Sequence, residues 1–344
     1  MMDASLFLNA TLAIIADPIH AALVADADVL RRTFVQASSL NAPSSTLVAL
    51  GLAILFSQVA GSVTGWWSWV DRLWSIVPAV YVALVAVHSG SQRLILMCVL
   101  SAVWALRLTL NFARKGGFGR VAADTEDYRW PVVRGWCDAI PSPAASRVAL
   151  ELFHTGFVCV YQHILLWLLV TPSALLAARG SAPLGTTDAA LAVLFVVLLV
   201  LETWADETQW AFQSRKHAMS PSERTRAGGD FSRGFLTSGP FRYSRHLNFF
   251  SEQCLWLVFA GFPLASGAVS SYASGALLGP LLLIGLFQGS TWITEMITVA
   301  KYPAYKEYQK TTSRLLPWLP GPPLSDAGSA AKTQKRSGSA AKRA

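Results

Sequence analysis

A dense group of polar residues stands immediately before one of the most apolar segments of this chain. Arg245, His246, Asn248 and Glu252 fall within eight residues, and the sequence CLWLVFAGF follows soon after. Asn248 and Glu252 are four residues apart, so in a helix they share one face. Arginine is well suited to binding phosphate groups, and amides and carboxylates to binding hydroxyl groups. The pattern therefore predicts a polar ligand site at the start of a helix.

A second polar series lies upstream of this group. Glu202, Asp206 and Gln209 recur at intervals of four and three residues, directly after the apolar run LAVLFVVLLVL. That spacing places the three side chains on one helix face over two turns. A charged residue at the centre of a membrane helix costs about 2.5–3.5 kcal/mol on insertion scales, so such a face needs partners. The series forms either a salt bridge within a helical bundle or one wall of a ligand pocket.

A third group closes another apolar segment. Arg107 and Asn111 are four residues apart in ALRLTLNFARKGGFG, so they share a face before the glycines end the helix. The arginine either anchors the helix at a membrane surface or contributes to an anion-binding surface. With the first two groups it predicts a phosphate-bearing ligand that reaches between helices, because phosphates favour arginine.

The chain lacks the motifs of the standard soluble nucleotide folds, because it contains neither GxGxxG nor GxxxxGK. The four cysteines form no CxxC pair and have no metal-ligand spacing. They are Cys98, Cys137, Cys159 and Cys254. We therefore expect buried thiols, no disulfide framework and no bound metal.

The amino-acid composition indicates which kind of element positions these polar side chains. Hydrophobic residues make up 53% of the 344 residues, and charged residues make up 14%, against about 25% in ordinary soluble domains. So few charges cannot cover the surface of a soluble globule of this size. The chain is therefore expected to be an all-α, polytopic membrane bundle.

Seven apolar segments approach the length of about 20 residues that crosses ~30 Å of hydrocarbon. They are residues 46–63, 74–88, 94–112, 149–171, 187–205, 252–270 and 274–299. The N-terminal stretch Leu6–Leu30 is interrupted by Asp17, Pro18 and further polar residues, so it is expected to be an amphipathic or extra helix. It lacks the basic start of a cleavable signal peptide.

The basic residues fall mainly on one side of this seven-span arrangement. Residues 113–147 hold six of the 28 lysines and arginines, residues 206–251 hold seven, and the tail after the last span holds nine. The positive-inside rule then places these loops and the C-terminus in the cytosol and the N-terminus on the other side. A positive charge of this origin needs no nucleic acid. The tail 319–344 is small, polar and basic, and is expected to be disordered.

Several segments together resemble one membrane family. SRHLNFFSE resembles the motif RHPNYFGE of the steroid 5-alpha-reductase C-terminal-like proteins, in particular the branch labelled DUF1295. Further segments resemble that branch in the same order: DRLWSIVPAVY, LNFARKGGF with EDYRW, YQHILLW, ADETQWAFQ and YPAYKEYQKTTSRLLPW. The resemblance covers about 65–318. We therefore expect one membrane domain over 46–318, flanked by the N-terminal segment 1–45 and the tail.

The resemblance implies a function and a site. It implies a helical bundle that holds NADPH among its C-terminal spans and reduces an enone or enoyl C=C bond in a sterol or other lipid. Position by position, Arg245, Asn248 and Glu252 fall in the cofactor motif of that family, and Asp206 and Gln209 match the motif-bearing helix before it. The full predicted cofactor set is Arg245, His246, Asn248, Glu252, Asp206, Gln209, Arg107 and Asn111. Glu295 stands where steroid reductases place an aromatic residue that contacts the cofactor.

This chain departs from the family motif at three positions. Leu247 stands where the motif has proline, Phe249 where it has tyrosine, and Ser251 where it has glycine. Steroid reductases use a Glu–Tyr pair from N-terminal spans to donate a hydrogen bond to the substrate carbonyl. The candidates for such a catalytic donor here are Tyr128, Tyr81 and Glu151.

Two other functions remain open from the sequence. Membrane methyltransferases of the isoprenylcysteine carboxyl type, which bind S-adenosylmethionine, share the RHPxY pattern at the start of a span. A non-catalytic lipid-binding relative would keep the fold and lose the activity. The lipid chemistry implied by the resemblance favours the endoplasmic reticulum membrane, and a bacterial inner membrane fits the same hydropathy.

Overall fold

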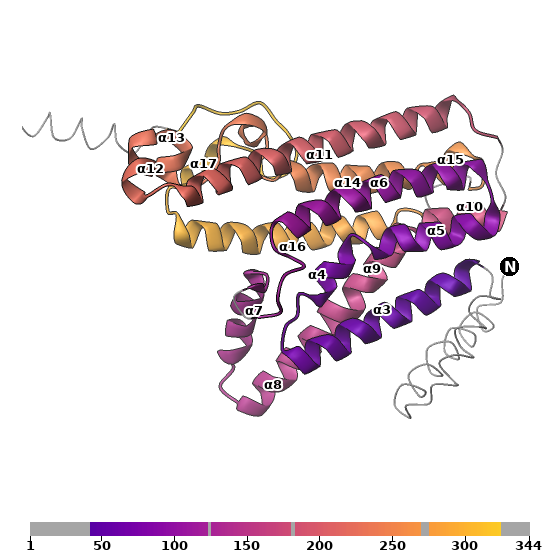
Figure 1. Ribbon diagram of the computed structural model, residues 1–344, viewed down its shortest axis with the longest axis horizontal. Helices are drawn as coiled ribbons and strands as arrows, with labels where there is room; N and C mark the ends of the chain where they lie inside the picture. Colours follow the sequence, from indigo (N-terminus) through magenta and orange to yellow (C-terminus); the bar gives the residue numbers. More distant parts are fainter. Residues whose placement is uncertain (1–41, 123–124, 180–182, 270–274, 325–344) are drawn as a thin grey trace, which may run out of the picture. The chain divides into compact units, whose positions relative to one another are not determined.

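The computed structural model describes residues 42–122, 125–179, 183–269 and 275–324, and every regular element in these ranges is a helix (Figure 1). The all-α membrane bundle predicted from the composition is confirmed. The expected N-terminal helix and the residues after 324 lie outside the described ranges.

The chain forms two compact units. Unit 1 comprises the described residues up to Phe195 together with Trp256–Leu283, and unit 2 comprises Val196–Leu255 together with the described residues from Ile284. The helices up to residue 179 are α3 Ala42–Thr64, α4 Trp69–Trp74, α5 Val77–Ser89, α6 Gln92–Arg114, α7 Arg129–Asp138, α8 Pro143–Leu152, the π-helix η2 Phe153–Tyr161, α9 Gln162–Leu169 and α10 Thr171–Arg179. The later elements are α11 Thr186–Ala218, α12 Pro221–Ala227, α13 Gly229–Arg233, the 3₁₀-helix η3 Gly239–Arg242, α14 Leu247–Phe259, α15 Phe262–Ala265, α16 Leu278–Lys301 and α17 Tyr305–Thr311.

Six helices in the described ranges are long and apolar enough to cross a membrane. They are Ser44–Thr64, Trp69–Ser89, Gln92–Arg114, Pro143–Leu169, Thr186–Ala218 and Leu278–Lys301. Each overlaps one of the predicted spans. The predicted span 252–270 differs, because α14 has 13 residues and α15 has four. The chain breaks at Gly261 and Pro263, and a proline interrupts the hydrogen bonds of a continuous helix.

The chain nevertheless has to cover a long distance between the start of α14 and the start of α16. Arg245, just before α14, pairs with Glu295 on α16. Glu295 lies 17 residues after Leu278, the first residue of α16, which is roughly 25 Å along a helix. The segment that leaves Arg245 must therefore return over about that distance to begin α16. A seventh membrane passage over this connection stays a prediction.

The connection after α6 is held down by side chains of unit 1. Arg72 on α4 donates to the Gly117 carbonyl at 3.0 Å and to the Gly119 carbonyl at 2.6 Å. Glu126 pairs with Arg134 and also accepts a hydrogen bond from the Trp67 backbone N–H at 2.6 Å. Several arginines of the predicted cytosolic loops therefore have structural partners.

The two ends of the spans can be assigned to sides by chemical labelling. In sealed membrane vesicles whose cytosolic face is outward, cysteine placed at the exposed Ser222 on α12 is expected to react with an impermeant maleimide, and cysteine at the exposed Ser89 at the end of α5 is expected to be shielded. The background would lack the four native cysteines. Vesicles opened with detergent, in which both positions should react, are the control. Equal labelling of both positions in sealed vesicles would contradict the orientation.

Candidate functional site

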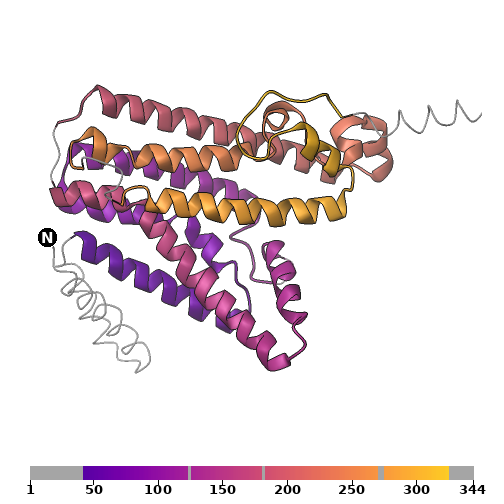
Figure 2. The same cartoon turned by 180° about the vertical axis from the view of Figure 1, so that it is seen from behind.

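The chain enters α14 through a tight, apolar connection in unit 2. The 3₁₀-helix η3 begins at Gly239, whose φ of 60° lies in the left-handed region that glycine favours. Phe241, before the polar motif, and Leu247, within it, pack with Ala205 and Phe212 of α11 and with Leu236. This apolar cluster fixes the backbone on which the motif side chains stand. In both views α11, α14 and α16 run side by side (Figures 1 and 2).

Arg245 and Glu295 form the centre of a buried polar network. Nε of Arg245 donates to Oε1 of Glu295 at 2.6 Å, and Nη2 donates to Oε2 at 3.1 Å, so the pair is bidentate. Nη1 of Arg245 donates to the backbone carbonyls of Gln309, at 3.1 Å, and of Thr312. Both charged side chains are less than a tenth exposed. One arginine therefore connects the start of α14, the end of α16 and the segment after α17.

Two further side chains complete the hydrogen bonds of Glu295. Nε2 of His246 lies 3.0 Å from Oε1, and Nε2 of Gln309 donates to Oε2 at 2.9 Å. The sequence identified Glu295 as the residue standing where the family has an aromatic contact. Here it accepts from three side chains, including the arginine and histidine of the motif. Glu295 therefore orients the guanidinium of Arg245.

The motif on α14 also meets the polar series on α11. Nδ2 of Asn248 donates to Oδ1 of Asp206 at 3.1 Å. Glu252, one turn further along α14, is buried, and Gln209 on α11 is half-buried. The structure thus brings together two groups that lie 42 residues apart and that the sequence predicted as a shared site.

The three departures from the family motif fill the space around this network. Leu247 belongs to the apolar cluster, and the buried hydroxyl of Ser251 donates to the Leu247 carbonyl at 3.0 Å. The ring of Phe249 stacks on His246 at a centroid distance of 5.6 Å and lies 4.6 Å from Phe287 of α16. The substitutions are accommodated by packing and leave the motif arginine, histidine, asparagine and glutamate in place.

The segment after α17 returns along the start of α14 and is here called the C-terminal clasp, residues 312–321. The backbone N–H groups of Arg245 and His246 donate to the carbonyls of Ser313 and Arg314 at 2.9 and 3.1 Å. In return the N–H of Trp318 donates to the Tyr243 carbonyl at 3.0 Å. The clasp therefore satisfies backbone groups ahead of α14 that would otherwise face water or a ligand.

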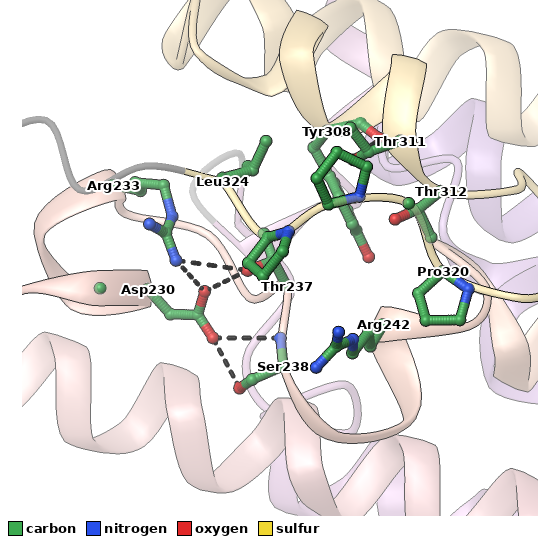
Figure 3. Close-up of a pocket in the computed structure, with 14 residues that line it drawn as sticks. Asp230, Arg233, Thr237, Ser238, Arg242, Tyr308, Thr311, Thr312, Pro320 and Leu324 are labelled. Atoms are coloured by element: carbon green, nitrogen blue, oxygen red, sulfur yellow. Dashed lines mark hydrogen bonds and ion pairs between the residues drawn. The ribbon is translucent and has the colours of Figure 1, made fainter.

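A cavity of about 340 Å³ lies beside the clasp and is lined by the connection between α13 and η3 (Figure 3). Asp230 organises its rim: Oδ1 accepts from Thr237 at 2.6 Å and from Arg233 at 2.9 Å, and Oδ2 accepts from the Ser238 hydroxyl at 2.7 Å. Burial raises the pKa of Asp230, but these hydrogen bonds outweigh it and hold the pKa below its ordinary value. The carboxylate is therefore an anion at neutral pH. Arg242 completes the polar side of the cavity.

The remaining predicted residues belong to unit 1. Arg107 and Asn111 lie on α6, where Asn111 is buried and accepts hydrogen bonds from Arg114 at 2.8 and 3.1 Å. Among the predicted catalytic donors, Tyr128 and Glu151 are exposed. Tyr81 on α5 is fully buried, and its hydroxyl has no hydrogen-bond partner among the described residues.

Sequence reasoning missed the cavity and the clasp. Arg233 and Arg242 were counted only among the basic residues of 206–251, although Gly234 and Gly239 in the same stretch are typical of a tight connection. The spacing of the tyrosines at 302, 305 and 308, with lysines between them, is typical of an interfacial aromatic belt. Instead Tyr305 and Tyr308 are buried against Phe235, and the Tyr308 hydroxyl donates to the Phe241 carbonyl.

The site lies within the part of the chain that matches a known protein family. The sequence model of a family described as "Protein of unknown function (DUF1295)" matches residues 58–312, which include α11, α14 and α16. The chain is also 36% identical over 291 residues to a protein of Schizosaccharomyces pombe described as "Uncharacterized protein C594.04c", and the match covers 80% of each chain. No solved structure matches the chain.

Proposed function

Because the chain belongs to the DUF1295 family, we propose that it is a membrane reductase that uses NADPH to reduce a C=C bond of an enone or enoyl group in a sterol or other lipid. The observation that carries the proposal is the buried polar group at the start of α14, where Asn248 meets Asp206 and Arg245 meets Glu295. Polar side chains at membrane depth are costly and mark functional sites. The resemblance of the motif to the cofactor motif of steroid reductases supports the choice of NADPH.

In this proposal the residues of unit 2 have separate roles. Asn248, held by Asp206, offers its amide to the ribose or carboxamide of the cofactor, and Glu252 accepts hydrogen bonds one turn deeper. Arg245 and His246 position Glu295 and the clasp, because their hydrogen bonds already go there. When bound, NADPH supplies the hydride for the β-carbon of the substrate.

The substrate carbonyl would need a hydrogen-bond donor as charge develops on its oxygen. The predicted donors Tyr81, Tyr128 and Glu151 all belong to unit 1. Of these, Tyr81 combines full burial with a hydroxyl that no described residue engages. The proposal therefore includes Tyr81 as the first position to test for this role. A lipid substrate also fits a chain whose long apolar helices suit a bilayer. The location in the endoplasmic reticulum membrane with a cytosolic C-terminus is part of the same proposal.

A second candidate function rests on a different observation. Arg245 makes hydrogen bonds to Glu295, Gln309 and Thr312, so its donors are engaged by residues of unit 2 itself. This favours a non-catalytic, lipid-binding membrane protein in which the polar group holds α14, α16 and the clasp together. The two candidates differ in whether Asn248 and Glu252 serve a ligand.

Replacing Asn248 with alanine is expected to weaken NADPH binding by about 1–3 kcal/mol, because a buried polar partner of the cofactor would be lost. Isothermal titration of the purified protein with NADPH, NADH and S-adenosylmethionine would measure this and the preference for the phosphorylated cofactor. The matched control is Thr208→Ala on α11, whose hydroxyl bonds to the Trp204 carbonyl of its own helix.

The same titrations separate the alternatives. Binding of S-adenosylmethionine alone would indicate the methyltransferase reading. Binding of none of the three, with Asn248→Ala and Glu252→Gln both lowering the melting temperature, would indicate the non-catalytic reading. Unchanged NADPH affinity in both variants would contradict the assigned site.

A further inference from the structure

We propose that the cavity beside the clasp binds the phosphate group of an organic phosphate and that Arg242 is the cation that recognises it. The cavity is separate from the side chains assigned above to the cofactor ring and ribose. Polar lining comes from α13 and the connection to η3, and further lining comes from the clasp and the three residues that follow it (Figure 3).

Arg242 is an exposed cation that has no counter-ion among the described residues. It has no ion pair or hydrogen bond with any residue in the described part of the chain, and Figure 3 shows its guanidinium directed into the cavity. Its backbone is held on both sides. The preceding Phe241 is buried and its carbonyl accepts from Tyr308, while the buried Ser244 donates to the Leu315 carbonyl at 2.7 Å. The five N–H donors of the guanidinium are therefore presented on a rigid support.

The other charges of the cavity compensate each other. Arg233 and Asp230 form an ion pair at 2.9 Å. Asp230 also accepts from Thr237 and Ser238, so its carboxylate is engaged by the protein on both oxygens. Since that pair is neutral overall, Arg242 gives the cavity lining a net charge of one positive unit. An anion that accepts several hydrogen bonds, such as a phosphate group, fits this donor set.

The rest of the wall argues for an organic phosphate and against a bare ion. Pro320, Pro322, Pro323 and Leu324 also line the cavity. These groups offer apolar, partly flat surface next to the cation. The cavity volume of about 340 Å³ falls in the range of roughly 300–1,000 Å³ that small organic ligands occupy. The ligand therefore combines a phosphate with a base, sugar or glycerol portion.

Two sources supply this chemistry. One is the 2′-phosphate and adenine end of the dinucleotide, and this source rests on the proposed function. The other is the phosphate headgroup of an anionic lipid, since a basic cavity next to exposed Trp318 and Leu319 suits a membrane surface. The recognition by Arg242 is the same for both.

The test compares Arg242→Ala with Arg226→Ala in the full-length protein. Arg226 is an exposed arginine on α12 that does not line the cavity. Adenosine 2′,5′-bisphosphate and adenosine 5′-monophosphate would be titrated against protein in detergent. Binding to nanodisc lipids would be compared between phosphatidic acid and phosphatidylcholine by native mass spectrometry. At least one phosphate probe is expected to bind the wild type, to lose about 10- to 100-fold in affinity in Arg242→Ala and to be unaffected in Arg226→Ala.

The outcomes are distinct from those of the proposed function. Loss of adenosine 2′,5′-bisphosphate binding assigns the cavity to the dinucleotide, and loss of phosphatidic acid binding assigns it to lipid whether or not the protein reduces anything. A folded Arg242→Ala protein that binds both probes as well as the wild type does overturns the proposal, as does a wild type that binds neither. In that case NADPH binding that depends on Asn248 would still support the reductase.

Discussion

Replacing Arg245 with methionine is expected to lower the free energy of unfolding by about 3–5 kcal/mol, because Glu295 would remain buried without its arginine. His246 and Gln309 would still contact the carboxylate, but the carbonyls of Gln309 and Thr312 would lose their donor. Unfolding in mixed detergent micelles, followed by tryptophan fluorescence, measures the effect.

The chain offers a matched control on the neighbouring helix α17. Lys310 and Glu307 form an ion pair at 2.8 Å whose side chains are 69% and 61% exposed. Lys310→Met is expected to cost at most about 1 kcal/mol, because solvent screens an exposed pair. The double variant Arg245→Met/Glu295→Met is expected to be more stable than Arg245→Met, since it removes the uncompensated charge. Equal stability of Arg245→Met and Lys310→Met would show that the network does not hold unit 2 together.

A loss of similar size, about 3–5 kcal/mol, is expected for Arg93→Met in unit 1. Arg93 at the start of α6 forms a bidentate pair with Asp188 at the start of α11, with distances of 2.6 and 2.8 Å. The side chains are only 2% and 3% exposed. Asp188 also accepts from the Gly185 N–H at 2.8 Å, and Arg93 donates to the Pro183 carbonyl at 3.1 Å. One pair therefore holds the start of α6, the start of α11 and the connection before α11.

The partly exposed pair of Arg129 with Asp127, at 2.8 Å, is the comparison for this variant. Arg129→Met is expected to lose less stability, because solvent reaches both side chains of the Arg129–Asp127 pair. The double variant Arg93→Met/Asp188→Leu should recover part of the loss, since an apolar pair can replace a buried ion pair. If Arg93→Met and Arg129→Met cost the same, burial would not be the reason for the strength of the first pair.

The sequence predicted what local composition determines. Six of the seven apolar segments are helices of membrane length, because an apolar stretch and the helical hydrogen-bond pattern are both properties of consecutive residues. The prediction of one continuous helix over 252–270 was wrong. The segment is apolar, but Gly261 and Pro263 interrupt the helix. The spacing of Asn248 and Asp206 indicated which helix faces carry polar groups, and the structure pairs these two side chains.

Partners far apart in the chain could not be predicted from local pattern. Arg245 and Glu295 are 50 residues apart, and Arg93 and Asp188 are 95 residues apart. The sequence around Arg93 does not indicate a buried residue, although Arg93 is buried in an ion pair. Neither residue carries a local signal of its partner, because the pairing follows from the packing of whole helices. The cavity of Arg242 escaped prediction for the same reason, since its two walls come from residues 229–242 and 308–324.

The clasp has a consequence for the order in which the protein is made. The chain leaves the ribosome from its N-terminus, so α14 and Arg245 are synthesised before Glu295 and well before the carbonyls of Gln309 and Thr312, which follow 64 and 67 residues later. Until these residues have been synthesised, the start of α14 lies at the membrane surface or among other helices, and water hydrates its arginine and its backbone N–H groups. The polar cluster can reach its final position only after the clasp has been released from the ribosome. Biogenesis of unit 2 is therefore completed from its C-terminal end.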